Sequence, residues 1–155
     1  MDQEVQQLIS ELEAAIKEIT NAVTNFPEYK REEALFGKWS LKDVMAHYCG
    51  WNLLTIKELG MLISGKPPIN WIKESQLDAF NKYEVEKRSA KSWTEIYEEF
   101  VKSWQDLVDK YKSLDEDHWK SQYGPGVEDT PHRSINLDIE HIQEHLVEIE
   151  QLPLI

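Results

Sequence analysis

The spacing of the apolar residues is the sequence feature that most constrains the fold. Between residues 2 and 26 apolar side chains recur every three or four positions, which places them on one face of a helix. This stripe consists of Val5, Leu8, Ile9, Leu12, Ile16, Ile19, Val23 and Phe26. Similar spacing continues through most of the chain, and no segment of four to eight residues alternates as a half-buried strand does. The sequence therefore predicts an all-α protein.

The same pattern predicts four long helices, near residues 2–26, 41–64, 92–112 and 134–151. Ser40 and Ser92 are the expected N-caps of the second and third, and Ser92 with Glu95 has the spacing of a capping box. Glycine and proline between residues 121 and 133 predict a loop before the last helix. Apolar residues between 69 and 90 indicate one or two extra short helices within a long connection.

We therefore predict a single domain over residues 1–155, built as an up-down four-helix bundle with a long crossover. No apolar stretch is long enough to cross a bilayer. The first residues are acidic and no apolar signal-peptide core follows them, so a cytoplasmic location is expected. Cys49, the only cysteine, lies in an apolar helical pattern and is expected in the core.

The net charge of −12 bears on the partners of the chain. Nucleic acids and anionic membrane surfaces are bound by clusters of lysine and arginine, which this sequence lacks. We therefore expect neither nucleic acid nor a membrane as a partner, and we expect a small-molecule ligand or substrate instead. A homo-oligomer is left open by the sequence.

Three histidines are the strongest candidates for chemistry. His141 and His145 are four residues apart, so both lie on one face of the last predicted helix, beside its apolar stripe. His47 lies within the apolar arc of the second predicted helix. In a bundle these positions can converge, and three imidazoles with an open fourth position form the ligand set of a catalytic zinc-type site. Such a site accepts a divalent transition metal, with zinc or nickel favoured. The alternative is that each histidine is a buried neutral residue with a hydrogen-bond partner.

Carboxylates near these histidines are a second group of candidates. Asp138, Glu144 and Glu148 lie within one turn of His141 or His145. On an amphipathic helix such residues usually form the solvated face. The functional interpretation that we favour is that Asp138 holds a ligand imidazole in place. His118 and His132 lie in polar or turn-rich segments and are expected at the surface, although the segment containing His132 could border the mouth of a pocket.

Several motifs resemble those of the DinB-like superfamily, and more narrowly of its ClbS/DfsB branch. The stretch GKWSLKDVMAH (37–47), followed by Gly50-Trp51, resembles the second-helix signature of these proteins. The segments DAFNKY (78–83), SWTE (92–95) and HIQEH (141–145) match the branch in order and spacing. The resemblance covers about residues 1 to 151.

This resemblance implies a bundle with a long crossover and a metal triad, which here would be His47, His141 and His145. The superfamily includes thiol-dependent transferases and isomerases. The ClbS/DfsB branch is associated with self-protection from a reactive metabolite, whose electrophilic cyclopropane is opened by water. Trp51 and Asn81 match recurring polar and aromatic positions, which implies that they line the substrate pocket.

Three functions remain open at this point. The first is a metal-assisted hydrolase or transferase that acts on a reactive metabolite. The second is a protein that binds or sequesters an apolar small molecule without turnover, as six tryptophans would allow. The third is a structural bundle in which the histidines pair with carboxylates.

Overall fold

The computed structural model describes residues 2–68 and 71–152, and none of these residues belongs to a β-strand. Its four long helices are α1 (Gln3–Thr24), α2 (Leu41–Ile63), α4 (Trp93–Lys112) and α6 (Pro131–Gln151). The shorter elements are η1 (Glu28–Lys30), η2 (Glu74–Gln76), α3 (Leu77–Lys87) and α5 (Glu116–Trp119). The all-α prediction is confirmed, and the short helices of the crossover are α3 and η2.

The helix starts follow from local capping. The Ser40 side chain accepts a hydrogen bond from the Asp43 backbone N–H at 3.1 Å, and the Asp43 carboxylate accepts one from the Ser40 N–H at 3.0 Å. A reciprocal capping box therefore begins α2. At Ser92, where the sequence predicts such a box, the structure shows only the bond from the Glu95 N–H to the serine oxygen.

The last helix begins earlier than the sequence predicts. We expected it to start near residue 134, after a loop over 121–133, but α6 begins at Pro131. The Thr130 hydroxyl accepts a hydrogen bond from the Arg133 N–H at 3.2 Å, which caps the helix one turn before the predicted start. Proline fits the first helical position because its fixed φ suits the helix and its missing N–H has no partner there. Pro131 therefore starts the helix.

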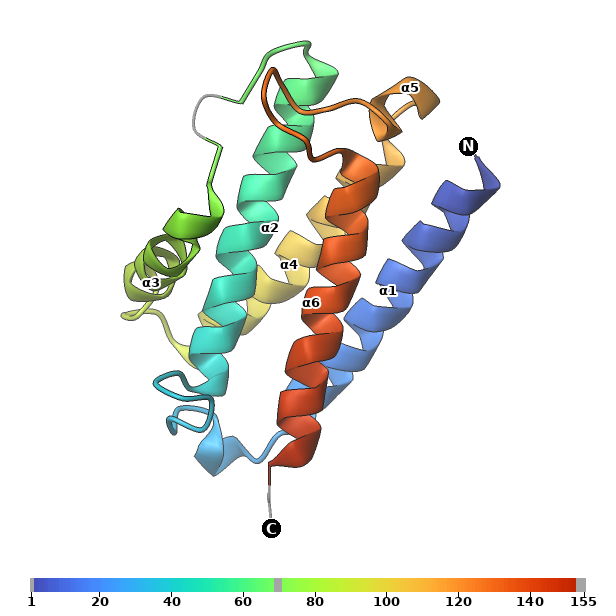
Figure 1. Ribbon diagram of the computed structural model, residues 1–155. Helices are drawn as coiled ribbons and strands as arrows, with labels where there is room; N and C mark the ends of the chain where they lie inside the picture. The colour runs from blue at the N-terminus through green and yellow to red at the C-terminus, as the bar shows by residue number, and fades with distance from the viewer. Residues whose placement is uncertain (1, 69–70, 153–155) are drawn as a thin grey trace.

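Figure 1 shows how the crossover arranges the bundle. The chain descends along α1, rises along α2, returns along the outside of the bundle through α3, rises again along α4 and descends along α6. Helix α2 packs on α3 and α4, α6 packs on α1, and α1 also packs on α4. By contrast, α2 and α6 approach each other closely at few points. The wide α2–α6 interface leaves space for a site.

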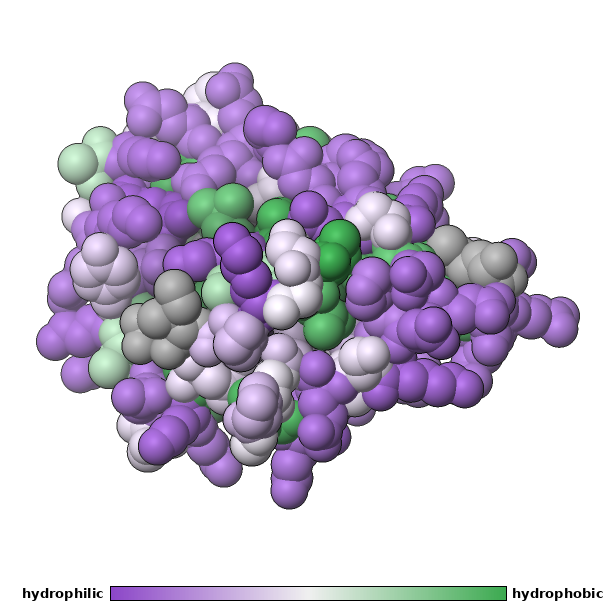
Figure 2. Space-filling model, turned by 90° about the horizontal axis from the view of Figure 1, so that it is seen from above, coloured by the Kyte–Doolittle hydropathy of each residue, from purple (hydrophilic) through white to green (hydrophobic). Residues whose placement is uncertain are grey.

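The core lies between α1, α2, α4 and α6 and contains both aliphatic and aromatic side chains. The largest fully buried rings are Trp104, Tyr48, Tyr111 and Phe100. The predicted stripe of α1 is buried except for the half-buried Ile16, and Cys49 is fully buried as expected. Seen from above, the surface is mostly hydrophilic, with apolar residues in small patches (Figure 2). Among the described residues, no helix combines the length and apolarity that a membrane span requires.

The crossover helix α3 is fixed to α4 by a buried ionic network and packs closely on α2. The Arg88 side chain is 3% exposed and contacts the carboxylates of Glu84 at 2.6 Å and Glu99 at 2.9 Å. Glycine at position 50 allows the close approach of this helix, because a Cβ atom there would lie 2.5 Å from Cγ of Glu84. The network and the glycine together place α3 beside the site.

Candidate metal centre

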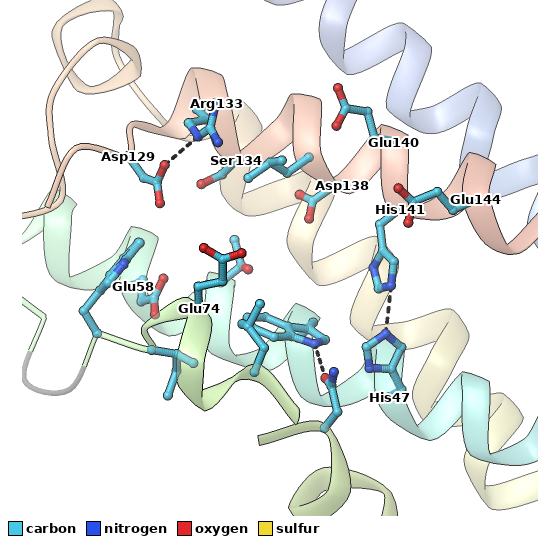
Figure 3. Close-up of a pocket in the computed structure, with 17 residues that line it drawn as sticks. His47, Glu58, Glu74, Asp129, Arg133, Ser134, Asp138, Glu140, His141 and Glu144 are labelled. Carbon is cyan, nitrogen blue, oxygen red and sulfur yellow. Dashed lines mark hydrogen bonds and ion pairs between the residues drawn. The ribbon is translucent and has the colours of Figure 1, made fainter. Parts of the chain in front are cut away.

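The three candidate histidines lie together between α2 and α6. Nε2 of His47 is 2.8 Å from Nε2 of His141, and Nε2 of His145 is 3.1 Å from the same atom. The potential ligand atoms of all three lie within 4.8 Å of one another. Figure 3 shows His47 and His141 facing each other from opposite helices. The convergence expected from the sequence is therefore present in the folded chain.

Hydrogen bonding among the histidines does not fully account for this arrangement. Nε2 of His141 has one in-plane position, which is either an N–H or a lone pair, so only one of its two contacts can be a well-directed hydrogen bond. Two ligand atoms about 2.1 Å from one ion, separated by angles of about 90–110°, stand about 3.0–3.4 Å apart. The two separations from Nε2 of His141, 2.8 and 3.1 Å, are close to that range, and the potential ligand atoms of all three residues lie within 4.8 Å of one another. The donor set and its spacing therefore fit a divalent transition metal.

The surroundings of the cluster keep its imidazoles neutral. Burial, and then the neighbouring histidines, lower the pKa of His47 to about 3. Burial likewise lowers the pKa of His141 to about 4, and it lowers the pKa of His145. Neutral imidazoles offer lone pairs at neutral pH, which metal ligation requires. Tyr48 fixes the backbone here by donating a hydrogen bond from its hydroxyl to the carbonyl of His141 at 3.0 Å.

Of the carboxylates near the histidines, Glu144 and Glu148 are exposed as expected, whereas Asp138 has a different partner from the one predicted. Asp138 does not hold a ligand imidazole. Instead, its Oδ2 accepts a hydrogen bond from the Tyr111 hydroxyl at 2.6 Å, because Tyr111 projects from α4 toward the same point. Burial raises the pKa of Asp138 to about 7. Glu148 is the carboxylate beside the cluster, with Oε1 3.6 Å from Nδ1 of His145, which is an ion-pair distance and too long for a hydrogen bond.

The two remaining histidines lie outside the cluster. His118 and His132 are half-buried rather than fully exposed, and each contacts a carboxylate, Asp115 at 3.1 Å and Glu4 at 3.0 Å. The segment containing His132 does reach the cavity beside the cluster, through its neighbour Arg133. These pairings explain both side chains without a metal.

A cavity of about 560 Å³ opens beside the histidines. It lies between α2 and α6, with η2, α3 and the preceding segment on one side (Figure 3). Both predicted pocket residues line it, and the Trp51 indole N–H donates a hydrogen bond to Oδ1 of Asn81 at 2.6 Å. The volume is within the range of small-molecule sites.

Several cavity residues were not predicted from the sequence. On α2 the stripe that contains His47 and Trp51 continues to Thr55 and Glu58, at spacings of four and three residues. That periodicity is the signal by which Glu58 could have been found. Trp71 and Asp129 also line the cavity but come from connections, where no periodicity marks them.

Comparison with known proteins places this architecture among solved structures. No family model matches the sequence, and no curated protein sequence matches it. ClbS, a colibactin self-resistance protein crystallised in complex with a dsDNA, is similar with a TM-score of 0.81 and 15% identity, over 96% of this chain and 94% of ClbS. DfsB, described as a sibling lethal factor precursor, has a TM-score of 0.81 and 16% identity, over 97% of this chain and 95% of DfsB.

A mycothiol-dependent maleylpyruvate isomerase is also similar, with a TM-score of 0.75 and 11% identity. The match covers 94% of this chain but 60% of the isomerase. The DNA in the ClbS crystal runs against our expectation that nucleic acid is excluded, because a protein with this fold was crystallised with a duplex. The expectation that nucleic acid is excluded as a partner is therefore not kept. The chain has the DinB-like helical-bundle fold, with ClbS and DfsB among its structural neighbours.

Proposed function

We propose that this chain binds a divalent transition metal, zinc or nickel, through His47, His141 and His145. We further propose that it acts as a hydrolase or transferase on a reactive small molecule held in the adjacent cavity. The observation that carries the proposal is that three Nε2 atoms converge beside a cavity of about 560 Å³. A bound metal would supply Lewis acidity that activates a water or thiol nucleophile.

The residues of the chain have separate roles in this proposal. The three imidazoles hold the ion in their neutral form. Trp51, fixed by its hydrogen bond to Asn81, forms a wall of the cavity and orients the substrate. The carboxyl group of Asp138 borders the cavity and accepts a hydrogen bond from the Tyr111 hydroxyl, and its pKa of about 7 lets it accept or return a proton near neutral pH.

The structural neighbours support a protective role. ClbS is described as a self-resistance protein, and the isomerase depends on a thiol. The first description fits protection from a reactive compound, and the second fits attack of a thiol nucleophile on a small molecule. We infer that this chain acts on a reactive metabolite in a similar way. Binding without turnover is the second candidate, because Trp51 and Trp71 could hold an apolar compound in the cavity without the metal.

The metal is tested by calorimetry on tag-free protein treated with a chelator. Titration with Zn²⁺ or Ni²⁺ is expected to show one ion per chain. His141→Ala should remove most of the affinity, because this residue contacts both other histidines. His132→Ala is the matched control, since its side chain pairs with Glu4 outside the cluster. Equal binding by wild type and His141→Ala would contradict the metal centre.

Turnover separates the two candidate functions. A strained-ring electrophile such as an aryl epoxide is incubated with metal-loaded protein, with and without an added thiol, and products are followed by mass spectrometry. We expect ring opening by water or thiol with wild type and a large loss with His141→Ala. A complex that forms without any product in either case would favour sequestration.

A further inference from the structure

The charged residues that line the cavity are mainly acidic. Its lining includes the acidic residues Glu58, Glu74, Asp129, Asp138, Glu140 and Glu144, against one basic residue, Arg133. Arg133 is already paired, with Nε 2.7 Å from Oδ1 of Asp129. In Figure 3 the side chains of Glu74, Asp129 and Asp138 point into the same space, whereas Glu140 points away from it. The cavity therefore contains negative charge that its own lining does not balance.

Burial is the main cause of raised pKa values at two carboxyl groups of the cavity. Burial, and then the negative charge of Asp129, raises the pKa of Glu58 to about 7. Burial raises the pKa of Asp138 to a similar value. Both groups lack a cationic partner among the described residues that line the cavity, because Arg133 pairs with Asp129. A cation inside the cavity would favour their ionised forms, and an anion would be repelled.

Two further features, independent of the carboxylates, indicate an organic ligand. Trp51 packs against Phe80 with ring centroids 4.5 Å apart, and Trp71 packs against Tyr123 at 5.0 Å, so both indoles are held as cavity walls. Indole faces attract cations within about 6 Å. His47, which is 4% exposed, also lines the cavity, and its Nδ1 makes no hydrogen bond of good geometry with a described residue, the side chain of Asn81 being its polar neighbour.

We propose that the cavity selects organic cations, such as molecules with a protonated amine or a quaternary ammonium group attached to an apolar body. The cationic group lies among Glu58, Glu74 and the indoles, and the rest of the molecule extends toward the histidines. As a statement about substrate class, this inference rests on the proposed function. Its charge preference can nevertheless be measured without any metal.

The test uses three probes of similar size: benzyltrimethylammonium, neutral N-benzylacetamide and anionic phenylacetate. The quaternary ammonium has no lone pair, so it cannot bind a metal directly. Binding to chelator-treated protein is measured by ligand-observed NMR at pH 8 and low salt. We expect the cation to bind at least about tenfold more tightly than the amide, and the anion not to bind. Equal binding of cation and amide, or no binding of the cation, would overturn the inference.

Variants locate the effect in the cavity. Glu58→Gln and Glu74→Gln should each weaken binding of the cation by about three- to tenfold and leave the amide unchanged. Glu74 is exposed on a short 3-10 turn, so its replacement leaves the core intact. Glu18→Gln on α1 makes the same charge change on an exposed site that does not line the cavity, and it should have no effect. Unchanged cation binding in both cavity variants would refute the placement.

Metal titration of the same proteins separates this inference from the proposed function. Glu58→Gln should still bind one metal ion per chain, because Glu58 is not a ligand, whereas His141→Ala should not. Normal metal binding without a preference for cations would remove the inference and leave the metal centre. A preference for cations without metal binding would remove the metal centre and leave this inference.

Discussion

Asp138→Asn is expected to stabilise the metal-free protein at alkaline pH. Burial raises the pKa of this carboxyl from its ordinary value of 3.8 to about 7. The folded state therefore prefers the protonated form, and the stability that this provides is fully present below pH 3.8 and is lost as the pH rises through about 7. Asparagine is neutral at all these pH values and can still accept the hydrogen bond from the Tyr111 hydroxyl.

The magnitude follows from the two pKa values. A difference of about 3 units between the folded and unfolded pKa corresponds to at most about 4 kcal/mol of unfolding free energy. Asp138 is half-buried and borders a cavity open to water, which reduces the cost of its charge. We therefore expect Asp138→Asn to be about 1–2 kcal/mol more stable than wild type at pH 8.5 and nearly equal to it at pH 4.

Urea unfolding followed by circular dichroism, at intervals between pH 4 and pH 8.5 with a chelator present, measures this difference. Glu140→Gln is the matched control, because Glu140 is an exposed carboxylate two residues away on the same helix. Its unfolding free energy should follow that of wild type. A difference between Asp138→Asn and wild type that does not change with pH would refute the assignment of the raised pKa to Asp138.

Two further predictions concern packing and the cavity wall. Gly50→Ala should lower the unfolding free energy by about 1–3 kcal/mol, because the new Cβ would lie 2.5 Å from Cγ of Glu84 and displace α3. Gly60→Ala is the control in the same urea assay and should be tolerated, because its Cβ would have no neighbour closer than 3.7 Å. Binding of benzyltrimethylammonium should change the tryptophan fluorescence, and Trp51→Phe should reduce that response, since Trp51 lines the cavity. An undiminished response in Trp51→Phe would place the ligand elsewhere.

The periodicity of the sequence predicts the long helices because it reflects which face each helix buries. It also brings the three histidines together, since His141 and His145 share a face and His47 faces inward. The start of α6 was predicted too late because the proline in the preceding segment indicated a loop, whereas the Thr130 cap makes Pro131 the first helical residue. Proline can end a loop or begin a helix, and here the Thr130 cap makes it begin the helix.

Partners that come from distant segments could not be predicted in this way. Asp138 was expected to hold an imidazole one turn away, but its hydrogen bond comes from Tyr111 on another helix. Trp71 and Asp129 reach the cavity from connections whose path depends on the packing of the whole bundle. The charge of the cavity is likewise a sum over helices, turns and connections, so no single segment of the sequence reveals it.

The position of the cavity explains how the fold accommodates a site without losing its core. Helix α2 packs on α4 and α6 packs on α1, so the apolar faces are buried by those pairs. The α2–α6 interface is left with polar contacts, chiefly the approach of His47 to His141 and the bond from Tyr48 to the His141 carbonyl. Buried polar residues that a well-packed core would exclude are expected at functional sites. Because a metal at this point would join α2 to α6, its binding and the stability of that interface are coupled.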